Sequence, residues 1–91
     1  MSNHIKNNDA HLYIIEIIKK LFEFTDVESA MHKNFEDLDI DSLGFLELIG
    51  EVEEYFDLEL SDAEVDLIKT GDDLVRAINR AIHLKNSAIA Q

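Results

Sequence analysis

Residues 41–56 read DSLGFLELIGEVEEYF, and they carry the strongest structural signal in the chain. Their large apolar residues follow the i, i+3, i+4, i+7, i+11 spacing that places side chains on one side of an α-helix. These residues are Phe45, Leu48, Ile49, Val52 and Phe56. Asp41 stands where an N-terminal cap is expected. The stretch therefore predicts an amphipathic helix over residues 42–56, with Ser42 at its start.

A second face of this predicted helix is acidic. Its glutamates follow an i, i+4, i+7 spacing, namely Glu47, Glu51 and Glu54. Leu43 and Leu46 flank them, and interfaces between proteins commonly combine an apolar centre with a charged rim. We therefore interpret this face as a contact surface. Gly50 lies inside the helix, where glycine costs about 0.5–1 kcal/mol relative to alanine, so the sequence predicts a packing reason for it.

Segments on either side of this helix also show helical spacing. Residues 9–22 carry a stripe of isoleucines, and a last segment carries apolar residues from Leu74 to Ile82. A short segment between them contains Val65 and Ile68. Two capping boxes are predicted at helix starts, Ser61 with Glu64 and Thr70 with Asp73.

Residues 23–41 lack a sustained period and predict a long loop. Apolar residues at intervals would hold it to the core, namely Val27, Met31, Phe35 and Leu38. The sequence thus predicts an all-α fold, a small four-helix bundle with a long loop between its first two helices and a short third helix. We expect one domain over residues 1–91, with residues 1–8 and 85–91 flexible.

The charge of the chain limits its partners. The 91 residues have a formal net charge of −12, and residues 34–68 contain thirteen acids and no Lys or Arg. Nucleic acid and anionic membranes are poor partners for such a surface, whereas a protein with a basic patch is attracted to it. The chain has no cysteine, and we see no secretory signal and no apolar run that could span a membrane. We expect a cytoplasmic monomer.

Ser42 invites a catalytic reading, which the sequence does not support. A nucleophilic serine needs an oriented base, and none of the four histidines stands at a motif spacing from Ser42. A calcium loop is also disfavoured, since Gly44 falls too late for the Asp-x-Asx-x-Asx-Gly pattern. We expect no catalytic residue and no dedicated metal site. A serine at a helix start does suit an attached anion, because free backbone N–H groups and the helix dipole favour negative charge there.

The chain resembles the acyl carrier protein family over roughly residues 9–82. The resemblance rests on Leu38-Asp39-Ile40-Asp41-Ser42-Leu43 followed by Glu47-Leu48 and Glu53-Glu54-Tyr55-Phe56. It implies a non-catalytic carrier in which Ser42 is esterified by 4'-phosphopantetheine from coenzyme A and acyl groups travel as thioesters between enzymes. The implied partners are a phosphopantetheinyl transferase and acyl ligases, synthases or transferases with basic docking patches. The residues expected to recognise them are Asp41, Leu43, Leu46, Glu47, Glu51, Glu53 and Glu54.

Two positions depart from the family pattern. Gly44 stands where carriers of fatty acid biosynthesis usually have an acid, and Asp39 stands where glycine is frequent. Both departures favour a specialised carrier over a housekeeping one. Three functions therefore stay open, namely an acyl carrier for fatty acid, polyketide or specialised acyl biosynthesis, an aminoacyl or peptidyl carrier of a dedicated pathway, and an unmodified acidic interaction module.

Overall fold

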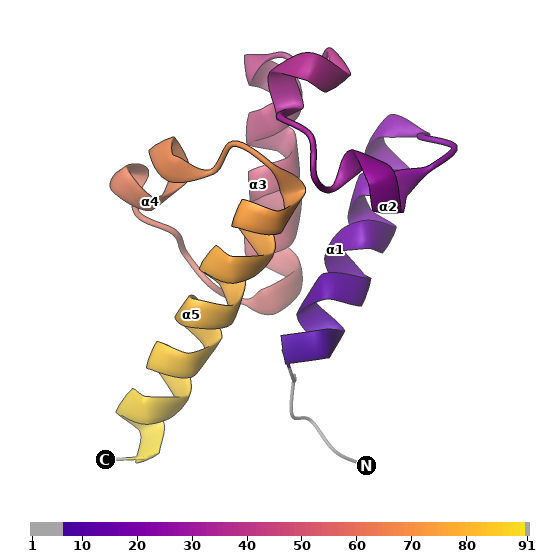
Figure 1. Ribbon diagram of the computed structural model, residues 1–91. Coiled ribbons are helices and arrows are strands. Elements are labelled where there is room, and N and C mark those ends of the chain that lie inside the picture. The colour runs from indigo at the N-terminus through magenta and orange to yellow at the C-terminus, as the bar shows by residue number, and fades with distance from the viewer. Residues whose placement is uncertain (1–6, 91) are drawn as a thin grey trace.

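The computed structural model describes the backbone of residues 7–90 and the side chains of residues 10–85. Its elements in chain order are α1 (Asn7–Phe22), α2 (Val27–Ala30), the 3-10 turn η1 (Phe35–Leu38), α3 (Ser42–Phe56), α4 (Asp62–Leu67) and α5 (Gly71–Ala90) (Figure 1). The predicted all-α bundle is confirmed, with α1, α3, the short α4 and α5 as its four helices. The single turn of α2 and η1 both lie within the predicted long loop.

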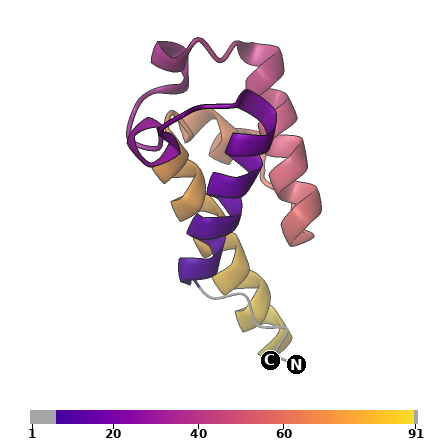
Figure 2. The same cartoon turned by 90° about the vertical axis from the view of Figure 1, so that its right-hand side faces the viewer.

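The core lies where the three long helices meet. α1 contacts both α3 and α5 (Figures 1 and 2). Each of the three helices contributes fully buried side chains, namely Ile14 from α1, Leu48 and Val52 from α3, and Leu74 and Ile78 from α5. The predicted apolar stripes are thus confirmed as the core faces of these helices. Burial of such side chains is the main favourable term in folding a domain of this size.

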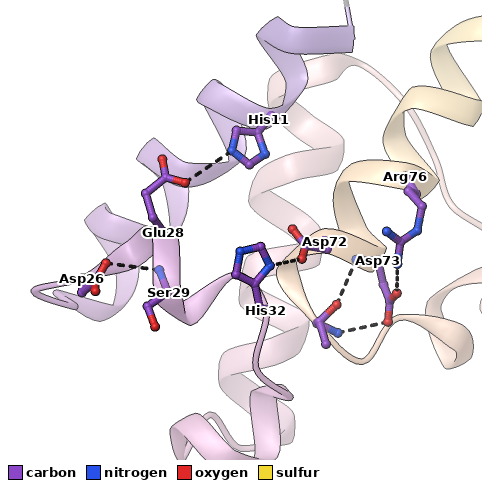
Figure 3. A network of polar contacts seen from close by, with 9 residues as sticks. His11, Asp26, Glu28, Ser29, His32, Asp72, Asp73 and Arg76 are labelled. Atoms are coloured by element: carbon purple, nitrogen blue, oxygen red, sulfur yellow. Dashed lines mark hydrogen bonds and ion pairs between the residues drawn. The ribbon is translucent and has the colours of Figure 1, made fainter.

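The long connection between α1 and α3 is fastened to the core and to α5. Val27, Met31 and Phe35 are buried as predicted, and Leu38 is partly buried. The carbonyl of Met31 accepts a hydrogen bond from the backbone N–H of Asp72 at 3.0 Å. Figure 3 shows the polar contacts around this junction, among them the contact of the His32 imidazole with the Asp72 carboxylate. The connection is therefore an ordered part of the fold.

The helix starts follow the predicted capping chemistry. Ser61 and Glu64 form a reciprocal capping box at the start of α4. The Thr70 hydroxyl accepts from the Asp73 N–H at 3.0 Å while the Asp73 carboxylate accepts from the Thr70 N–H at 3.2 Å. Both boxes are confirmed, and each satisfies backbone donors that a helix start otherwise leaves unpaired.

The helix ends differ slightly from the predicted boundaries. α1 begins at Asn7, two residues earlier than predicted, and α5 continues to Ala90 through the stretch for which a loose tail was expected. Residues 1–6 and 91 lie outside the described residues, so the flexibility expected of residues 1–8 and 85–91 stays a prediction. No helix within residues 7–90 is both long and apolar enough to cross a membrane.

Candidate functional site

Ser42 is the first residue of α3, and its side chain is exposed. Asp41 caps the helix as predicted, because its carboxylate accepts a hydrogen bond from the Gly44 N–H at 2.8 Å. The Ser42 hydroxyl forms no hydrogen bond with another described side chain or backbone group. The helix start is thus held by its neighbour, and the hydroxyl stays available for reaction. Free N–H groups and the positive end of the helix dipole favour an anionic group at this point.

The backbone turns sharply just before the site. Asp39 has φ 62° and ψ 28°, in the left-handed region that glycine adopts without strain. Its N–H donates to the Glu36 carbonyl at 3.1 Å, which closes η1 and sends the chain into the start of α3. This geometry suits the glycine that the family resemblance leads us to expect at this position. The departure at Asp39 is a tolerated substitution, since aspartate is among the residues that enter this region most readily.

A cavity of about 400 Å³ opens beside Ser42. Its walls come from η1, the start of α3, the end of α4 and the loop that follows. The rings of Phe35 and Phe45 lie with their centroids 5.5 Å apart and form part of the apolar wall. The lining residues are Asn34, Phe35, Glu36, Ile40, Asp41, Ser42, Phe45, Val65, Asp66, Ile68 and Lys69. The site therefore combines a free hydroxyl with space next to it.

Lys69 is a cavity residue that the sequence reasoning did not single out. The fold brings it to the cavity that Ser42 also lines, because the Phe35 N–H donates to the Lys69 carbonyl at 2.9 Å, beside a bridge between Asn34 and Thr70. No described carboxylate lies within ion-pair distance of the Lys69 ammonium. Its signal in the sequence is its place directly after the thirteen-acid block of residues 34–68.

The residues predicted to recognise partners divide into two groups. Leu43 and Leu46 are 78% and 58% exposed, and Glu47 and Glu54 are exposed beside them. Neither the Glu47 carboxylate nor the Glu54 carboxylate has a hydrogen-bond or ion-pair partner among the described residues. We call Leu43, Leu46, Glu47, Gly50 and Glu54 the outer face of α3, since helical spacing places them together, away from the core.

Three other predicted recognition residues have contacts within the fold. Glu51 pairs with Lys20 of α1 at 3.2 Å, and Glu53 accepts a hydrogen bond from the Leu60 N–H at 2.8 Å. Asp41 is occupied as the cap of α3. These three carboxylates stabilise the bundle, so the structure gives each of them a structural role, and a part in recognition stays a prediction.

The two glycines of α3 have opposite surroundings. A Cβ on Gly44 would lie 3.3 Å from both Asp41 Oδ1 and Ile40 Cγ2, so a side chain there would require one of these neighbours to shift slightly. The interpretation of Gly44 as a mark of a specialised carrier stays a prediction. A Cβ on Gly50 would meet no side chain of the described residues within 4 Å. The prediction of a packing reason for Gly50 is wrong, because Gly50 lies on the side of α3 that faces away from the core.

Comparison with known proteins identifies the family of the chain. Residues 13–78 match the family model described as "Phosphopantetheine attachment site". The chain is 36% identical over 74 residues to an acyl carrier protein of Kocuria rhizophila, covering 72% of this chain and 91% of that protein. It is 33% identical over 64 residues to an acyl carrier protein homolog of Mycoplasmopsis pulmonis, covering 70% and 88%.

An all-helical bundle with a free serine hydroxyl at a helix start, matched over most of its length by this model, defines a phosphopantetheine-dependent carrier domain. The chain belongs to the acyl carrier protein family. 4'-Phosphopantetheine is accordingly its prosthetic group, and phosphopantetheinyl transferases and acyl-handling enzymes are the partners that the family has in general.

Proposed function

We propose that Ser42 carries the 4'-phosphopantetheine group and that the protein shuttles acyl groups as thioesters between partner enzymes. The observation that carries this proposal is the exposed Ser42 hydroxyl, which has no hydrogen-bond partner in the described structure and opens onto the cavity of about 400 Å³. Ser42 also lies within the matched region of residues 13–78.

The residues around Ser42 fit a bulky, singly charged phosphodiester. In the attachment step the Ser42 oxygen loses its proton and bonds to phosphorus, and the pyrophosphate bond of coenzyme A breaks to release adenosine 3',5'-bisphosphate. Exposure of the hydroxyl lets a transferase reach it, and Asp41 keeps the helix start in place. The Lys69 ammonium would offset the negative charge of the phosphate. The carboxylates of Glu36 and Asp41, which line the same cavity, would repel that charge.

The group supplies a terminal thiol that holds the cargo as a thioester. The protein's own contribution is to tether that thiol, and so to raise its effective concentration at each docked enzyme. Weak contacts that exchange quickly suit such a shuttle, because the carrier must leave each enzyme after one reaction. The pathway we propose is acyl biosynthesis, with fatty acids, polyketides or a specialised acyl product as the outcome.

The outer face of α3 is the proposed docking surface. It begins one residue after Ser42, and its two exposed leucines lie beside Glu47 and Glu54, whose charges have no described partner. A partner with Arg or Lys residues is attracted to this face, which raises the association rate without requiring tight binding. The net charge of −12 extends the attraction over the whole molecule.

The attachment is tested by intact-mass spectrometry of the purified protein after incubation with coenzyme A and a phosphopantetheinyl transferase. We expect the mass to increase by one phosphopantetheine. Ser42→Ala should show no increase. Ser29→Ala is the matched control, since Ser29 is also exposed but lies in α2, and this variant should be modified like the wild type. A modified Ser42→Ala protein would refute the assignment of the site.

A further inference from the structure

Gly50 is an exposed glycine in the middle of α3. The nearest described side chains lie more than 4 Å from the position that its Cβ would occupy, so packing within the fold does not require glycine here. No glycine of the described residues has a positive φ, so backbone conformation does not require it either. Gly50 also lies six residues before the end of α3 at Phe56, too early to act as a C-terminal cap.

Glycine at this position nonetheless has a cost. In a helix interior it lowers the folding equilibrium constant by about two- to fivefold relative to alanine, because the unfolded backbone is more flexible. For a 91-residue domain, whose stability margin is small, this is a measurable disadvantage. No contact or backbone conformation among the described residues offsets this loss of stability.

The surroundings of Gly50 suggest where the compensation lies. Leu46 is four residues before it and Glu54 is four residues after it, so both are its neighbours on the helix surface. Leu43 and Leu46 remain 78% and 58% exposed, although apolar side chains of that size are normally buried. Gly50 therefore leaves a gap, a position without a side chain, in the outer face of α3. Leu43 and Leu46 lie on the Ser42 side of this gap, and Glu47 and Glu54 lie before and after it along the helix.

We propose that this gap is a recess that receives an apolar side chain of a partner enzyme's basic docking surface. The inference rests on the proposed carrier function and identifies the kind of partner. The partner presents a protruding apolar side chain that contacts the α3 backbone at Gly50 and the two leucines. Arg or Lys residues around that side chain face Glu47 and Glu54. Charge complementarity favours a basic protein surface, since the chain has a net charge of −12.

A side chain at Gly50 would occupy the recess and hold the partner away from α3. Crowding a packed contact weakens it, and the effect grows with the size of the added group. The same substitution removes the helix penalty of glycine. Gly50→Ala should therefore give a free protein that is more stable than the wild type but binds its partner more weakly.

The experiment uses the apo protein, a phosphopantetheinyl transferase with a basic docking surface, and coenzyme A. The Kd for the transferase and the modification rate at low carrier concentration are measured for the wild type, Gly50→Ala and Gly50→Leu, together with the Tm of each. We expect Gly50→Ala to raise the Tm and to weaken binding. Gly50→Leu should weaken binding further, by about tenfold or more.

Ala63→Leu is the control for added bulk, because Ala63 is exposed on α4 and lies outside the outer face of α3. It should bind like the wild type. Unchanged or tighter binding by Gly50→Leu would overturn the recess, since it would show that the face has no need of the space. A wild type that the transferase never modifies would instead refute the proposed carrier function, and the two failures are therefore distinct.

Discussion

Oδ1 of Asp41 lies 2.8 Å from the backbone nitrogen of Gly44 and would lie 3.3 Å from a Cβ on that residue. The capping bond that starts α3 thus also limits the space for a side chain at Gly44. Gly71 is more crowded, since its Cβ would lie 2.5 Å from the sulfur of Met31. With Gly50 in open space, the chain offers three glycines with three degrees of crowding.

We expect alanine substitutions at these glycines to affect stability in the order of that crowding. Gly50→Ala should raise the free energy of unfolding by about 0.5–1 kcal/mol, because alanine is the better helix former. Gly44→Ala should gain less, since Asp41 must shift. Gly71→Ala should lower it by about 1–3 kcal/mol through the clash with Met31. Urea unfolding measures all three, and an equal gain at positions 44 and 50 would contradict the role of the cap.

Asp39→Gly should stabilise the protein, because Asp39 has φ 62° and only glycine adopts that region freely. The expected gain in the free energy of unfolding is about 0.5–1 kcal/mol, with attachment of phosphopantetheine unchanged. Asp37→Gly is the matched control, since Asp37 lies in η1 and has no positive φ. If Asp37→Gly stabilised the protein as much, loss of negative charge rather than backbone strain would be the cause.

The apolar periodicity was sufficient to predict α3 at Ser42–Phe56 and the core faces of α1 and α5, since a helical stripe identifies its own buried side. Contacts between distant segments left no such pattern. Two such contacts bring lysines to the acidic block of residues 34–68, which contains no Lys or Arg of its own. Lys20 forms an ion pair with Glu51, and the Lys85 ammonium donates to the Asp57 carbonyl at 2.9 Å. The same holds for Lys69, which lines the cavity beside Ser42 because residues 34–35 pair with residues 69–70.

Stability should depend on pH through the capping box of α5. The hydrogen bond from the Lys69 N–H is the main cause that lowers the pKa of Asp73 below its ordinary 3.8, and Arg76 adds to it. A carboxyl with a lowered folded-state pKa contributes stability that is fully present above pH 3.8 and is lost as the pH falls through the folded-state pKa. We therefore expect the Tm of Asp73→Asn to lie below that of the wild type at neutral pH and to approach it in acid.

The Tm of both proteins is measured by circular dichroism from neutral pH downward. Asp62→Asn is the control, because the Asp62 carboxylate is exposed and accepts no hydrogen bond from a described residue. Its Tm at neutral pH should differ little from that of the wild type. A Tm difference for Asp73→Asn that stays constant into acid would show that packing, not the ionised carboxylate, stabilises this helix start.

The carboxylates of α3 should separate into residues that serve docking and residues that serve stability. Glu47 and Glu54 have no described partner, so reversing both to lysine should leave the Tm nearly unchanged. The loss of steering should slow transferase loading by about tenfold at low salt, and by less as added salt screens the wild type.

The matched double variant replaces Glu51 and Glu53 by lysine, which makes the same change in net charge on the same helix. It breaks the ion pair with Lys20 and the hydrogen bond from the Leu60 N–H. Because the latter leaves a partly buried donor unpaired, this variant should lose about 1 kcal/mol or more of unfolding free energy. Its loading rate should fall less than that of the Glu47/Glu54 variant. Equal loss of loading in both variants would show that net charge, rather than the outer face of α3, attracts the transferase.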